Sequence, residues 1–91
     1  MYVIALHNIT DADGFWAAAG PAIESLPAGT TLHSMFPEQD GSKSVCLWEA
    51  ESVESVRSLV EGAVGAFSQN EYYPVAAAQA MGLPQASTVT A

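Results

Sequence analysis

Two short segments, residues 2–9 and 44–50, are apolar on both of their alternating faces, and this pattern limits how the chain can fold. Both segments are rich in β-branched and aromatic residues, which favour strands. The first presents two sets of alternating residues, Tyr2, Ile4 and Leu6 against Val3, Ala5 and His7. The second presents Val45 and Leu47 against Cys46 and Trp48. A sheet built around these strands therefore needs cover on both of its faces.

Two more strands are predicted from turn and proline signals. Residues 30–36 precede the Asp40-Gly41 pair, a turn signal that joins them to residues 44–50 as a hairpin. Residues 70–76 predict a fourth strand. Pro74 confines this strand to a sheet edge, because proline cannot donate a hydrogen bond to a neighbouring strand.

Two helices are predicted between the strands. Residues 10–13 supply a capping side chain and acidic groups, and apolar residues recur at helical spacing from there to Leu26. Gly20-Pro21 lies inside this run and predicts a kink or a break, because proline removes one helical hydrogen bond. Ser52 caps the second helix, whose apolar face continues to Phe67.

The resulting order, β-α-β-β-α-β, is most simply an α+β ferredoxin-like fold with residues 2–9 and 44–50 in the two central strands. The chain has 91 residues, so it holds one domain, which we place at residues 1–84. Residues 85–91 are expected to form a flexible tail.

The ferredoxin-like arrangement puts both helices on the same face of the sheet, so the other face should be polar in a monomer. In this chain neither face of the central strands is polar. We therefore expect a homodimer in which the helix-free sheet faces of two copies pack together as a dimeric α/β barrel.

Charge and cysteine content limit the partners and the compartment. Ten acidic residues face only Lys43 and Arg57, for a net charge of −8, so nucleic acids and anionic membranes are excluded as partners. No apolar run approaches the length of a membrane span, and no basic stretch precedes the first strand, which argues against a signal peptide. A single cysteine, Cys46, fits a reducing compartment, so we expect a cytoplasmic protein.

Several segments carry a family likeness. His7, the Cys46-Leu47-x-Glu49 pattern, and the segments 32–34, 40–41, 52–57, 70–73 and 80–84 resemble small bacterial dimeric α/β-barrel proteins. The nearest group is an uncharacterised domain family that includes a nickel-binding protein from actinomycetes. The resemblance covers residues 1 to about 84 and implies this fold, a dimer, and nickel or another divalent transition metal as a cofactor.

A metal site would draw on the four strong ligand types of the predicted strands, which are His7, His33, Cys46 and Glu49. Imidazole and thiolate ligands suit nickel and zinc, and carboxylates complete such sites. No two of these residues are close in sequence, so a shared site depends on strand register. The alternative interpretation is that both histidines are structural and that Cys46 is a small core residue.

A second hypothesis is chemistry in an apolar pocket. His7 and His33 could share such a pocket with Asn8, Trp16, Trp48, Tyr72 and Tyr73. Relatives of the same fold include monooxygenases and isomerases, which implies a cofactor-independent enzyme acting on a small apolar or aromatic substrate. No nucleophile or acid–base pair stands at a diagnostic spacing, so the sequence itself predicts no reaction. The third class is an interaction module without a ligand.

Overall fold

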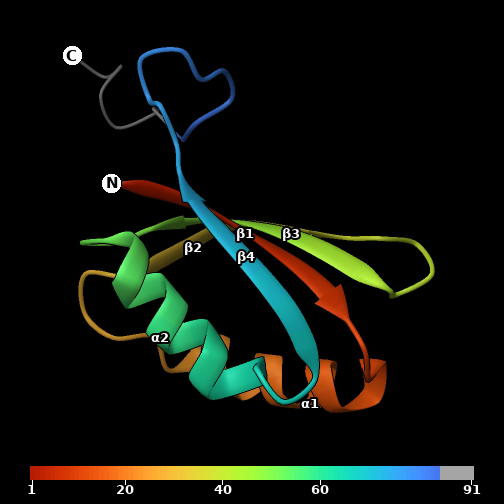
Figure 1. Cartoon of the computed structure of the whole chain (residues 1–91). Coiled ribbons are helices and arrows are strands. Elements are labelled where there is room, and N and C mark those ends of the chain that lie inside the picture. The colour runs from red at the N-terminus through yellow and green to blue at the C-terminus, as the bar shows by residue number, and fades with distance from the viewer. Residues whose placement is uncertain (85–91) are drawn as a thin grey trace.

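The computed structural model describes residues 1–84, and the predicted tail 85–91 lies outside them. Within the described part the predicted order of strands and helices is confirmed (Figure 1). The elements are β1 (Tyr2–Ile9), α1 (Ala12–Glu24), β2 (Thr31–Pro37), β3 (Lys43–Glu49), α2 (Val53–Val64) and β4 (Ser68–Pro74).

The four strands form one antiparallel sheet in the order β2-β3-β1-β4, so the chain is an α+β ferredoxin-like domain. The predicted central strands are confirmed as β1 and β3, and β4 lies at an edge with Pro74 as its last residue. β1 and β3 pair with Ala5 opposite Cys46 and His7 opposite Ser44. Because side chains alternate along a strand, this register decides which candidate residues share a face.

Both helices begin with side-chain caps. Oδ1 of Asp11 accepts a hydrogen bond from the Gly14 amide at 3.1 Å, and Ser52 and Ser55 form a reciprocal capping box. A Cβ atom at Gly14 would lie 2.6 Å from the Phe67 ring, so any other residue would have to displace this ring where α1 meets the start of β4. α2 ends at Val64, three residues before the predicted end, and β4 correspondingly starts at Ser68.

The predicted break at Gly20-Pro21 does not occur, because α1 runs through Pro21 to Glu24. Proline leaves the carbonyl of Ala17 without its helical partner. Ala17 and Pro21 are both exposed, so water can bond that carbonyl on the outer side of the helix.

Both helices cover one face of the sheet, and we call this the covered face (Figure 1). Its central residues, Val3, Ala5 and Cys46, are buried and pack against apolar residues of both helices. Neither helix of residues 1–84 is long and apolar enough to cross a membrane. The core of the domain therefore lies between this face and the two helices.

The opposite face, which we call the open face, carries no helix. Its central residues are Ile4, Leu6, Val45 and Leu47. Among the neighbouring residues, Phe36 is 67% exposed and Tyr73 is 49% exposed. Residues 75–84 rise beyond β4 on the side of the sheet opposite the helices (Figure 1). The open face is thus apolar and bounded at one end by its own chain.

Candidate functional site

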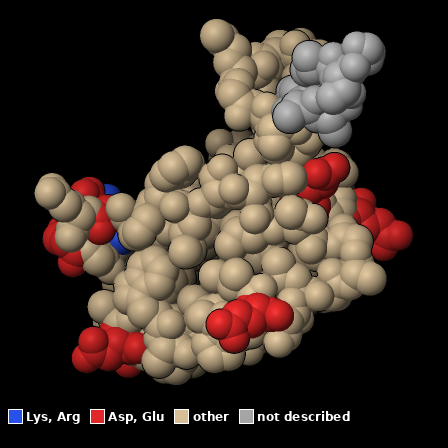
Figure 2. All heavy atoms as spheres, turned by 180° about the vertical axis from the view of Figure 1, so that it is seen from behind, with Lys and Arg blue, Asp and Glu red and all other residues tan. Residues whose placement is uncertain are grey.

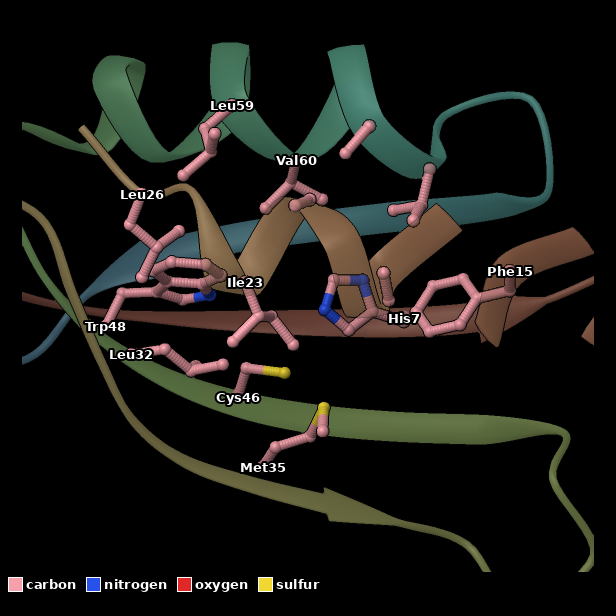
Figure 3. A pocket seen from close by; sticks show the side chains of 14 residues that line it. His7, Phe15, Ile23, Leu26, Leu32, Met35, Cys46, Trp48, Leu59 and Val60 are labelled. Carbon is pink, nitrogen blue, oxygen red and sulfur yellow. The ribbon is translucent and has the colours of Figure 1, made fainter. Parts of the chain in front are cut away.

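A pocket of about 40 Å³ lies between the helices and the covered face of the sheet (Figure 3). Its lining is aliphatic and aromatic, with polar atoms only on His7, Cys46 and Trp48. The lining residues are His7, Phe15, Ala19, Ala22, Ile23, Leu26, Leu32, Met35, Cys46, Trp48, Leu59, Val60, Ala63 and Val64. Apolar pockets with a few convergent polar groups are the usual form of a small-molecule site.

A hydrogen-bond chain holds the His7 ring in one orientation. Nδ1 of His7 lies 2.7 Å from Oδ1 of Asn70, and Nδ2 of Asn70 donates to Oε2 of Glu61 at 3.0 Å. Because the Asn70 amide nitrogen faces the carboxylate, its oxygen accepts the proton of His7 Nδ1. This leaves Nε2 of His7 with a free lone pair, and Figure 3 shows one ring nitrogen pointing into the pocket toward Ile23 and Trp48.

Burial lowers the pKa of His7 from its ordinary value, and the Asn70 hydrogen bond and the Glu61 charge only partly oppose this. His7 is therefore neutral at pH 7. The pKa of Glu61 is lowered by hydrogen bonds from the Tyr72 hydroxyl, at 2.6 Å, and from Asn70, so this carboxylate stays ionised. The pocket consequently contains a neutral imidazole that can accept a hydrogen bond or a proton.

Cys46 lies on the same face as His7, but its thiol stays protonated at neutral pH. It is 4% exposed, and burial raises the pKa of its thiol to about 11. Both metal binding and nucleophilic attack require the thiolate. Cys46 therefore serves as a small apolar part of the pocket floor at neutral pH.

The other two predicted metal ligands lie on the open face. Nε2 of His33 and Oε1 of Glu49 are 2.8 Å apart, and the His33 ring is tilted against Tyr2 with centroids 5.8 Å apart. The structure thus divides the four candidates into two pairs on opposite faces. No group of three or more His, Cys, Asp and Glu residues in the described part of the chain is placed to hold a metal ion.

The residues predicted to line a pocket also fall into two groups, those at the pocket and those away from it. Trp48 lines the pocket, and Trp16 packs beside it by an edge contact with Phe15, with ring centroids 4.7 Å apart. Tyr72 lies at the margin, where its hydroxyl bonds Glu61. Asn8 and Tyr73 are exposed and fall outside the pocket lining.

The sequence analysis missed the two residues that orient His7. Asn70 is 63 residues from His7, and Glu61 belongs to α2. A prediction of how β1 pairs with the edge strand could have found Asn70, because this pairing places it directly opposite His7. That register depends on where β4 begins, and β4 begins two residues earlier than predicted.

The fold and the pocket together define a ferredoxin-like α+β domain with an apolar cavity between its helices and its sheet. Comparison of the chain with protein-family models, curated proteins and solved structures found no match. The fold bears out the ferredoxin-like part of the resemblance stated above, while the nickel-binding family has no support from these comparisons.

Proposed function

We propose that the protein binds a small, mostly apolar molecule in the pocket between its helices and its sheet. The observation that supports this is a neutral imidazole, His7, held in one tautomer at the wall of an otherwise apolar cavity. The hydrogen bonds from His7 to Asn70 and from Asn70 to Glu61 satisfy Nδ1 of His7. Nε2 is then the ring nitrogen left to bond a molecule in the cavity.

The same geometry favours an organic ligand over nickel. On the covered face only His7 and Cys46 remain of the four predicted ligands, and the high pKa of the Cys46 thiol opposes metal binding at neutral pH. A cofactor-independent enzyme stays a prediction. His7 would be its base, and among the described residues that line the pocket the other titratable side chain is the Cys46 thiol, which stays protonated at neutral pH.

The experiment is a titration with toluene and, in parallel, with Ni²⁺, followed by the NMR signals of the Leu26 and Leu59 methyl groups. The cavity is smaller than a benzene ring needs, so we expect Met35 and Leu26 to change rotamers as the ring enters. Ala22→Leu fills the pocket, and Ala17→Leu adds the same atoms to the exposed side of the same helix.

Wild type and Ala17→Leu should bind toluene, and Ala22→Leu should bind it at least about tenfold more weakly, since filling the site removes the contact area. Equal binding by Ala22→Leu would refute the proposal, and so would a wild type that binds neither toluene nor its hydroxyl analogue phenol. Saturable Ni²⁺ binding that is lost in His7→Ala would instead support the metal site.

We further propose that two copies associate through the open face. Leu6 is 38% exposed there, beside the more exposed rings of Phe36 and Tyr73. A groove on this face is formed by strand residues together with the segment 75–84, in which Met81 is 95% exposed. Seen from behind, with the open face directed upward, the molecule carries its acidic side chains in separate groups on the visible side (Figure 2). A second copy would bury these apolar side chains, and the segment would flank it.

Sedimentation of the full chain tests the assembly. Leu6→Lys places a charge on the open face, and Ser58→Lys places the same charge on the exposed side of α2. Wild type and Ser58→Lys should sediment near twice the 9.5 kDa of one chain at micromolar concentration, and Leu6→Lys as a monomer. A monomeric wild type, or a dimeric Leu6→Lys, would contradict the interface.

A further inference from the structure

We propose that the ligand of the helix–sheet pocket is a small alcohol or phenol. Its hydroxyl oxygen would accept a hydrogen bond from the indole N–H of Trp48, and its hydroxyl hydrogen would be donated to Nε2 of His7. This inference rests on the proposed function and names the chemical class of the ligand. It is carried by two polar groups whose requirements are complementary.

The first group is Trp48. Its side chain is 5% exposed, and its Nε1 atom is buried without a hydrogen-bond partner within residues 1–84. A buried N–H without a partner costs about 1–3 kcal/mol, so native structures seldom leave one. In Figure 3 the Trp48 nitrogen lies on the edge of the indole that faces Ile23 and the inside of the pocket. An acceptor atom in the pocket would satisfy it.

The second group is His7. Its Nδ1 proton is committed to Asn70, so its Nε2 can only accept a hydrogen bond while the ring is neutral. The pocket thus offers a donor at Trp48 and an acceptor at His7. A hydroxyl group matches both, because its oxygen accepts and its hydrogen is donated.

The two groups stand two same-face positions apart on the sheet, and in Figure 3 their nitrogens face Ile23 from opposite sides. The hydroxyl group would therefore enter between them by displacing the Ile23 side chain. Trp48 stands opposite Val3, and His7 opposite Ser44, with the pair Ala5 and Cys46 between them on the same face. Cys46 lines the pocket between the two groups and has a small side chain. The remaining walls come from apolar side chains of α1, α2 and β2, which fit the hydrocarbon part of the ligand.

The experiment compares phenol with toluene, which have nearly the same shape and differ in a hydroxyl against a methyl group. In an apolar cavity without partners phenol should bind more weakly than toluene, because it loses its hydrogen bonds to water. With Trp48 and His7 as partners we expect phenol to bind at least about tenfold more tightly, the value of one net hydrogen bond.

Trp48→Phe keeps an aromatic ring and removes the N–H, and Trp16→Phe is the matched control outside the pocket lining. Trp48→Phe should lose the preference for phenol and still bind toluene, while Trp16→Phe should keep the preference. In the wild type the indole N–H signal of Trp48 should move downfield with phenol, as a newly hydrogen-bonded N–H does, and should show no such downfield shift with toluene.

The outcomes separate the two proposals. If neither compound binds the wild type, the proposed function fails. If toluene binds as tightly as phenol, or if the preference for phenol survives in Trp48→Phe, the pocket is a site for apolar molecules and the hydroxyl assignment is wrong. The comparison in the wild type needs no variant, so poor folding of Trp48→Phe would leave the test intact.

Discussion

The two faces of the sheet are made by the same strands and differ in how they are used. The covered face is centred on small residues, Val3, Ala5 and Cys46, and the open face on larger ones such as Ile4 and Leu47. Small residues allow the helices to approach closely and still leave a cavity beneath them. The larger residues leave an apolar surface on the open face, which the proposed second copy would cover. Apolar alternation alone does not distinguish a face that receives helices from one that is left open.

The largest effect should come from removing one phenylalanine ring from each side of the sheet. Phe15 is 3% exposed on the covered side, so Phe15→Ala should lower the free energy of unfolding by about 3–5 kcal/mol. Phe36→Ala, on the open side, should cost the isolated protomer less than about 1 kcal/mol. Urea unfolding measures both values, at protein concentrations below the dissociation constant of the proposed dimer. Equal losses would mean that the open face is part of the protomer core.

Moving the cysteine by one residue compares the faces by reactivity. Because burial raises the pKa of the Cys46 thiol to about 11, iodoacetamide at pH 8 should modify folded wild type about 100-fold more slowly than urea-unfolded protein. In the double variant Cys46→Ala and Leu47→Cys, the new thiol faces the open side. It should react much faster than wild type in dilute solution, and the proposed dimer predicts a slower reaction at higher protein concentration. Fast modification of folded wild type would contradict the burial of Cys46.

Acid should destabilise the protein through His7. The pKa of His7 in the folded state lies below its ordinary value of 6.5. At a pH between the folded-state and the unfolded-state pKa, the unfolded chain binds a proton at His7 and the folded chain does not. The contribution of His7 to the free energy of unfolding is therefore fully present above about pH 6.5. It falls with decreasing pH by at most about 1.4 kcal/mol per pH unit. Urea unfolding at pH 7 and pH 5.5 measures the loss, and this window lies above the range in which Glu61 titrates.

His7→Gln should remove most of that pH dependence. His33→Gln, which changes the histidine of the open face, should keep the part that comes from His7. A wild-type protein equally stable at both pH values would show that burial of His7 does not disfavour its charged form.

The smallest effect is expected at the rim of the covered face. Arg57 lies 3.4 Å from Glu54 and 4.8 Å from the centre of the Tyr72 ring, and both charged side chains are substantially exposed. Exposed pairs of this kind contribute about 0–1 kcal/mol. Arg57→Gln should therefore lower the unfolding free energy by less than about 1 kcal/mol, and by still less at high salt. Phenol binding should be unchanged, because Arg57 lies outside the pocket lining.

Much of the fold could be predicted from the sequence, because its signals are local. The Asp40-Gly41 turn, the Ser52 cap and the period of two in residues 2–9 each depend on neighbouring residues. Together they predicted the order of elements and the two central strands, both of which the structure confirms. A kink or a break was expected at Gly20-Pro21, and the break was wrong, because the exposure of the helix surface around Pro21 depends on packing.

The candidate site depended on relations that no local pattern encodes. The sequence singled out His7 and Cys46, but the same list held His33 and Glu49, and the register put that pair on the opposite face. The position of His33 follows from a register shift between Leu32 and Ser34, and a shift of one residue exchanges the two faces of a strand. The tautomer of His7 depends on Asn70 and Glu61, which reach it from β4 and α2. The sequence by itself determined the elements, because hydrogen bonding and periodicity act over a few residues. Only the tertiary structure decided which side chains meet, because strand register and helix placement are set by packing across the whole domain.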